Sequence, residues 1–95
     1  MKIYLITQDL VHGYDTYDSA VVSAESEEDA KNIHPSECVT HIKDGMWMGT
    51  FTKGGEYEYT SRNWVSASNL DQVKVQYIGE SKRGRGLILS SFNAG

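Results

Sequence analysis

Alternating apolar and polar positions predict strands near both ends of the chain. Residues 2–7 carry apolar side chains on both faces, which is typical of a strand covered on both sides. Residues 17–24 combine two adjacent valines with alanines small enough to lie under a helix. Residues 73–77 alternate strictly, and residues 87–92 form an apolar run after a glycine-rich connection. We therefore predict four strands, two towards each terminus.

One short helix is predicted directly after the second strand. Ser26 precedes three consecutive acidic residues, and its hydroxyl can accept a hydrogen bond from the backbone N–H of Asp29. The acidic first turn also complements the positive end of the helix dipole. Pro35 cannot continue a helix. These signals predict a helix over roughly residues 27–33.

The middle of the chain predicts a strand at residues 39–42, followed by a hairpin. Asp44-Gly45 favours a turn with positive φ, and the aromatic-rich segments 47–52 and 56–60 flank Gly54-Gly55. Two adjacent glycines suit a two-residue hairpin turn. We therefore expect a hairpin that carries an aromatic ribbon.

The segment 61–71 is polar apart from a few side chains, and we interpret it as a loop that Trp64 pins to the core. The complete pattern predicts an α+β fold with a mainly antiparallel sheet of about 4–6 strands and one short helix after the second strand. Residues 1–95 are expected to form a single domain.

The length of 95 residues limits the kind of ligand site that the chain can build. A core of this size leaves little room for a deep internal cavity. We therefore expect any ligand site to lie on the surface or between subunits, and we predict a homo-oligomer.

Charge and cysteine content exclude further classes. The chain has 9 basic and 13 acidic residues, a net charge of −4, whereas duplex nucleic-acid binders are normally basic. A single cysteine, Cys38, allows no intramolecular disulfide and fits a reducing compartment. No run approaches the ~20 apolar residues of a membrane span, and the N-terminal apolar run is too short for a signal peptide. We predict a cytoplasmic location. We also predict that the protein binds neither a membrane nor a duplex nucleic acid.

Two histidines and a cysteine lie close together in the sequence, namely His34, Cys38 and His41. Histidine and cysteine can bind zinc, and together they can act as base and nucleophile. Their spacing matches no zinc finger, and no second cysteine completes a ligand pair. A helix-ending histidine and a core cysteine explain them more simply. We predict no metal, no cofactor and no catalytic residue, and we leave open whether these three residues have a function.

Aromatic residues are the most distinctive part of the composition. Flat rings stack on nucleobases at about 1–3 kcal/mol per base. The same rings also suit protein interfaces, or simply fill a small core. As candidates for base stacking we select Tyr14, Tyr17 and Trp64.

The only dense basic segment is residues 82–86. Glycines let the backbone approach an anion, and Arg83 and Arg85 could hold phosphate in a bidentate manner. The segment lacks the spacing of a P-loop, and a solvated hairpin loop is the simpler alternative. Asp15 and Asn93 are candidates to recognise a ribose or the edge of a base.

Several motifs also carry a resemblance. They include Gly-Tyr-Asp-Thr-Tyr-Asp-Ser-Ala-Val-Val at 13–22, Ile-His-Pro at 33–35 and Gly-Leu-Ile-Leu-Ser-Ser-Phe-Asn-Ala-Gly at 86–95. On these motifs the chain resembles a family of small bacteriophage and prophage proteins, over nearly its whole length. The resemblance implies an accessory protein that acts in the cytoplasm of the infected host and counters host defence. It implies no enzymatic activity.

Two functions from different classes follow from these observations. The first is non-catalytic binding that sequesters a nucleotide-type small molecule. The alternative is a protein–protein inhibitor of a host defence or regulatory protein, favoured by the acidic balance and the aromatic ribbon near Gly54-Gly55. An enzyme is a third hypothesis, and it depends on His34, Cys38 and His41.

Overall fold

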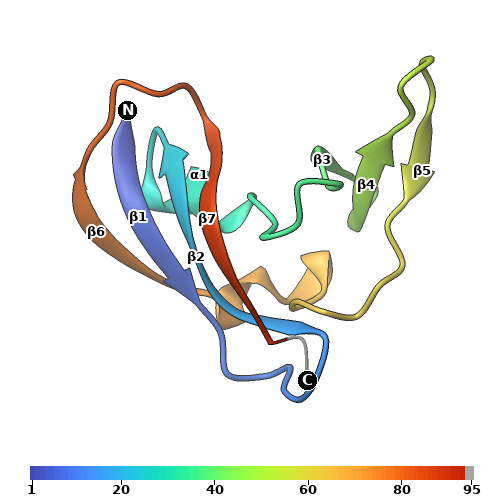
Figure 1. Cartoon of the computed structure of the whole chain (residues 1–95), viewed down its shortest axis with the longest axis horizontal. Coiled ribbons are helices and arrows are strands. Elements are labelled where there is room, and N and C mark those ends of the chain that lie inside the picture. Colours follow the sequence, from blue (N-terminus) through green and yellow to red (C-terminus); the bar gives the residue numbers. More distant parts are fainter. Residues whose placement is uncertain (94–95) are drawn as a thin grey trace.

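Seven strands form two antiparallel sheets (Figure 1). The computed structural model describes residues 1–93. The larger sheet has the order β6-β1-β2-β7, with bounds Lys74–Glu80, Lys2–Thr7, Thr16–Ala24 and Gly86–Asn93. The smaller sheet has the order β3-β4-β5, with bounds His41–Lys43, Met46–Thr50 and Glu56–Glu58. The predicted α+β class is confirmed, with the strands divided between two sheets.

The predicted helix after the second strand is also confirmed. Helix α1 spans Glu27–Lys31 and begins with the expected cap, in which the Ser26 hydroxyl accepts a hydrogen bond from the Asp29 N–H at 3.1 Å. Its residue Ala30 is fully buried, and the helix contacts β1, β2 and β6. The helix thereby covers the core face of the larger sheet.

A 3-10 helix, η1 (Ala67–Gln72), begins within the segment 61–71 that we predicted to be a loop and ends one residue after it. The Ser66 hydroxyl caps it, and the Asn69 N–H donates to the Ser66 carbonyl at 2.9 Å. A helix of six residues is too short to show a periodic apolar pattern in the sequence. The hydrophobic pattern could therefore not predict it. Among the described residues, neither helix has the length and apolar character that crossing a bilayer requires.

The two predicted turns of the smaller sheet have different outcomes. Asp44 and Gly45 join β3 to β4 with φ values of 53° and 75°, as expected for this turn type. Residues 51–55 join β4 to β5, so the predicted two-residue turn at Gly54-Gly55 is wrong. The Gly54 N–H donates to the Phe51 carbonyl at 3.0 Å. This bond forms a tight turn within the connection, which is longer than two residues.

A single buried cluster connects the two sheets. The indole N–H of Trp47, on β4, donates to the carbonyl of Val65 at 2.9 Å. Trp64 is only 3% exposed, which confirms that it pins its loop to the core. The cluster takes side chains from β1, β2 and β4, from α1 and the residues after it, and from the chain before and after η1. Its members are Tyr4, Ile6, Ala20, Val22, Ala24, Ala30, Ile33, Trp47, Trp64, Val65 and Val73.

Replacing Gly49 by alanine should destabilise the fold, because a Cβ there would lie 2.7 Å from the Cys38 carbonyl oxygen and closer still to the Tyr57 ring. Overpacking of this kind costs about 1–3 kcal/mol of the free energy of unfolding. The matched control is Gly79→Ala on β6, where nothing lies within 4 Å. Urea unfolding of both variants measures the difference, and equal stabilities would contradict the packing described for Gly49.

Candidate functional site

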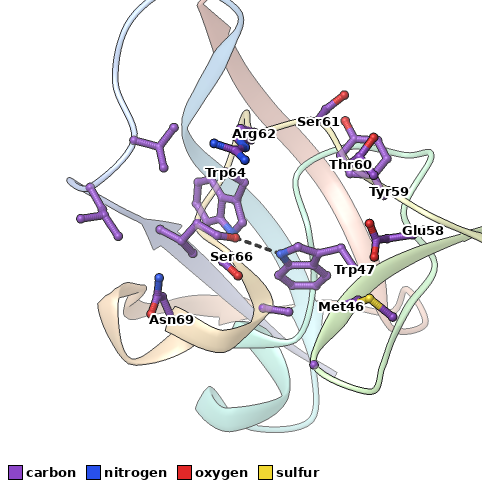
Figure 2. Close-up of a pocket in the computed structure, with 15 residues that line it drawn as sticks. Met46, Trp47, Glu58, Tyr59, Thr60, Ser61, Arg62, Trp64, Ser66 and Asn69 are labelled. Carbon is purple, nitrogen blue, oxygen red and sulfur yellow. Dashed lines mark hydrogen bonds between the residues drawn. The ribbon is translucent and has the colours of Figure 1, made fainter.

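Two adjoining hollows lie on either side of residues 61–64, and Ser61 and Arg62 line both of them. The first encloses about 570 Å³ (Figure 2). The second encloses about 520 Å³. We call the two hollows together the Arg62 surface. The volume of each lies within the range of small-molecule sites.

The first hollow has an aromatic floor and a mixed rim. Trp47 and Trp64 line it but are almost completely buried, at 6% and 3% exposed. Exposed side chains of Leu10, Met46 and Arg62 line it as well. A hydrogen bond from the Trp47 indole, drawn in Figure 2, fixes one wall against the chain that follows Trp64. The hollow therefore combines a rigid apolar base with one positive charge, from Arg62, and one negative charge, from Glu58.

The second hollow is built around the turn at residues 13–16. Gly13 and Asp15 have positive φ values of 100° and 61°. Asp tolerates this conformation better than most residues, and glycine adopts it without steric cost. The Thr16 hydroxyl donates to the Gly13 carbonyl at 2.7 Å and closes the turn. The turn leaves the ring of Tyr14 76% exposed beside the hollow.

Two buried polar atoms next to these hollows have no hydrogen-bond partner among the described residues. They are Oδ1 of Asn63, which lines the second hollow, and Nε1 of Trp64, which lines the first. The other polar atom of the Asn63 amide, Nδ2, donates to the Tyr59 hydroxyl at 2.8 Å. An unsatisfied buried polar group costs about 1–3 kcal/mol. Groups of this kind call for an explanation, and a functional site is one.

A buried histidine lies beneath the same segment. His34 is 3% exposed, and four aromatic rings surround its imidazole. The ring centroids of Trp47 and Tyr59 are each 5.0 Å away, and those of Tyr17 and Trp64 are at 6.2 Å and 6.5 Å. All four contacts have edge-on geometry, which aromatic quadrupoles favour. This cluster holds the floor of the first hollow.

The imidazole of His34 is held in its neutral form. Its Nδ1 accepts a hydrogen bond from the Ser36 N–H at 2.9 Å, so Nδ1 carries no proton. Burial lowers the pKa of His34 to about 4, because the apolar surroundings disfavour the charged ring. His34 therefore has a structural position, within the core that supports the Arg62 surface.

Four of the sequence-predicted site residues lie at or next to the Arg62 surface. Tyr14 and Asp15 line the second hollow, and Trp64 lines the first. Tyr17 lies below them, where its N–H donates to the Asn63 carbonyl at 2.8 Å and burial raises the pKa of its phenol. The ring centroids of Tyr17 and Phe92 lie 4.8 Å apart, so Tyr17 packs against a residue that lines the second hollow.

The predicted phosphate-binding residues lie at the other end of the larger sheet. Asn93 pairs with Thr16 beside the Tyr14 turn, whereas Gly86 pairs with Ser23. The seven residue steps from Gly86 to Asn93 correspond to roughly 23 Å. Arg83 and Arg85 precede Gly86, so one chain does not bring them to the aromatic residues. Asn93 was also predicted to bind ligand, and its side chain lies outside the described residues.

Arg85 is in addition already paired within its own chain. Its guanidinium donates to the carboxylate of Asp29, in α1, at 2.7 Å. Arg83 is exposed, and its backbone N–H donates to the Ser81 hydroxyl at 2.8 Å. Of the two arginines, Arg83 is the one whose side chain points to no acidic partner among residues 1–92.

Arg62 is central to the observed arrangement but was not predicted from the sequence. A usable signal was present, since Arg62 is the only basic residue between Lys53 and Lys74, and it lies two positions before Trp64. A single basic residue close to a tryptophan that anchors its loop indicates a binding site better than a solvated run of basic residues does.

The structure separates His34, Cys38 and His41. His34 is buried in the aromatic cluster, Cys38 is exposed, and the His41 Nε2 lies 2.7 Å from a carboxylate oxygen of Glu56. Lys43 contacts the same carboxylate, and these two partners lower the pKa of Glu56. Within residues 1–93, no group of three or more potential ligands could hold a metal ion.

Comparison with known proteins adds no relative from which a function could be taken. No family model, no curated protein and no solved structure matches the chain. The resemblance to bacteriophage proteins therefore stays a prediction.

The free energy of unfolding should decrease as the pH is lowered from 6.5 to 4, because of His34. Unfolding restores its pKa from about 4 to the ordinary 6.5, so the unfolded chain binds a proton that the folded chain excludes. The full contribution is present above pH 6.5 and is lost as the pH falls towards 4, a change of about 3 kcal/mol. Urea unfolding at several pH values measures it.

The controls use the same chain. His34→Phe keeps an aromatic ring but cannot titrate, so its stability should be lower at neutral pH and change less between pH 6.5 and 4. His41→Gln removes a partly exposed histidine and should keep the decline of the parent protein. A His34→Phe variant with the full pH dependence would show that another group causes it.

Proposed function

We propose that the protein binds a nucleotide-type small molecule at the Arg62 surface and does not transform it. The planar guanidinium of Arg62 would bind a phosphate in a bidentate manner. The exposed ring of Tyr14 would stack on a base, and the carboxylate of Asp15 would accept hydrogen bonds from ribose hydroxyls. The apolar first hollow would take a second ring of the ligand.

One observation carries this proposal. Arg62 lines both hollows, and no carboxylate of residues 1–92 forms an ion pair with it. An unpaired guanidinium in a hollow that the exposed ring of Tyr14 also lines offers charge and aromatic surface together. Phosphate and base are the two parts of a nucleotide that these groups match.

The cellular role that we propose is sequestration of such a molecule. Binding without turnover removes a signal in proportion to the amount of protein, so tight affinity would matter more than catalysis. The motif at residues 13–22, which carries the resemblance to bacteriophage proteins, includes Tyr14 and Asp15. The proposed binding residues therefore belong to the segment that carries the resemblance. This supports the proposal of a bacteriophage accessory protein that counters host defence by sequestration.

A second candidate is inhibition of a protein partner through the β4–β5 hairpin. The hairpin projects away from the larger sheet (Figure 1). At its tip Phe51 is 56% exposed and packs against Tyr57, with ring centroids 4.7 Å apart. An exposed phenylalanine on a projecting hairpin fits the pattern of an interface anchor.

Isothermal titration with a panel of cyclic dinucleotides and cyclic ADP-ribose isomers tests the first proposal. Arg62→Ala should weaken binding about 10- to 100-fold, which corresponds to the loss of one charged hydrogen-bonding group. Tyr14→Ala should weaken it by a similar factor through lost stacking. Lys53→Ala is the matched control, because it removes an exposed cation from the distant hairpin loop.

The outcomes separate the candidates. If no member of the panel binds, the nucleotide proposal fails. If a nucleotide binds and Arg62→Ala binds it equally well, the proposed site is wrong. If Phe51→Asp abolishes the activity in cells while nucleotide binding by the purified protein is unchanged, the hairpin is the functional surface.

A further inference from the structure

The outer edge of β7 lacks the usual protection of an edge strand. Within the larger sheet β7 pairs only with β2, so one side of its backbone has no strand beside it. Its eight residues, Gly86–Asn93, include no charge and no proline. Edge strands normally carry such residues, or are short, because an open edge recruits other strands.

The other sheet edges show these protections. β6, at the opposite edge of the same sheet, begins with Lys74 and ends with Glu80. β3 and β5, at the edges of the smaller sheet, have only three residues each and carry charges. β7 is therefore the long uncharged edge of this fold.

The side chains on β7 also extend an apolar row. Leu89 is 67% exposed and pairs with Val21, which in turn pairs with Leu5. These three side chains lie on the sheet face opposite the core. Phe92, near the end of the strand, is 45% exposed. The row ends at Leu89 with nothing in residues 1–92 to cover it.

We propose that β7 pairs antiparallel with β7 of a second copy of this chain, across a two-fold axis. Two identical strands in antiparallel orientation form a closed, self-complementary contact. A pairing over eight residues supplies about eight backbone hydrogen bonds. The strand is uncharged, so two copies meet there without bringing like charges together, although each chain carries a net charge of −4. The Leu89 rows of the two copies then lie on the same face and continue into each other.

This dimer would also complete the Arg62 surface, a consequence that rests on the proposed function. Antiparallel pairing places the Gly86 end of one β7 beside the Phe92 end of the other. The Tyr14 turn lies at that Phe92 end, because Thr16 pairs with Asn93. Arg83, whose carbonyl accepts from Ser23 of β2, then lies at the same end of the joined sheet as Tyr14 of the other copy, about three strand spacings (~14 Å) away. The groups that one chain holds roughly 23 Å apart would then face one ligand.

Sedimentation equilibrium of the ligand-free protein tests the pairing. The wild-type chain should have a mass of about 21 kDa, twice 10.6 kDa. Leu89→Lys should raise the dimer dissociation constant at least about tenfold, because it puts like charges at the contact. The matched control is Ile78→Lys on β6, which is 48% exposed and should leave the dimer intact. A monomeric wild type, or equal effects of the two variants, overturns the proposal.

Amide hydrogen exchange distinguishes edge pairing from stacking of sheet faces. In the dimer, amides of β7 that point away from β2 should exchange slowly, and in Leu89→Lys they should exchange fast. Protection of the β1–β2 amides in both proteins shows that the variant is folded, and Ser91→Lys serves as a second variant if it is not. A dimer whose outward β7 amides exchange freely overturns edge pairing.

Cross-linking tests the approach of Arg83 to Tyr14 without any ligand. A Cys38→Ser chain that carries Tyr14→Cys and Arg83→Cys should give covalent dimers with a short bismaleimide. Replacing Arg83→Cys by Lys53→Cys provides the control, which should give few. Failure of this reaction in a protein that sediments as a dimer overturns the composite site. Since none of these three measurements uses a nucleotide, failure of the proposed function would be seen separately.

Discussion

The burial of one neutral imidazole among four aromatic rings holds the parts of this fold together. His34 follows α1, and its ring contacts Tyr17 of β2, Trp47 of β4, Tyr59 after β5, and Trp64. The two sheets share no strand pairing, so these ring contacts, with the buried cluster and the Trp47–Val65 hydrogen bond, determine how the sheets are placed relative to each other. A charge on the imidazole would be costly there, because the rings replace the water that would stabilise it.

The candidate site depends on this cluster. Trp47 and Trp64 pack against His34 on one side and line the first hollow on the other. The chain between Tyr59 and Trp64 is thus anchored at both ends, and Arg62 is presented from a short, fixed segment. A preorganised cation beside aromatic surface is the property that would let a small fold bind a charged ligand without a deep cavity.

Local signals in the sequence predicted most of the elements. The strand at residues 2–7 and the helix start at Ser26 were confirmed because alternation and capping act over a few neighbouring residues. The division into two sheets could not be predicted, since periodicity identifies a strand without identifying its partners. Likewise, Arg83 and Arg85 lie a few residues before β7 in the sequence, but the length of β7 separates them from Tyr14 in space. Arg62 was missed because its importance arises from two hollows that only the folded chain brings together.

The central claim is that the Arg62 surface binds a nucleotide, and mapping of NMR chemical shifts tests it most directly. We expect a cyclic dinucleotide to shift the amide resonances of residues 12–16 and 61–64, together with the Nε–H of Arg62 and the unpartnered indole N–H of Trp64. The amides of the β4–β5 hairpin loop should stay unchanged. Shifts confined to residues 81–85 or to the hairpin, or no shifts with the whole panel, would contradict the claim.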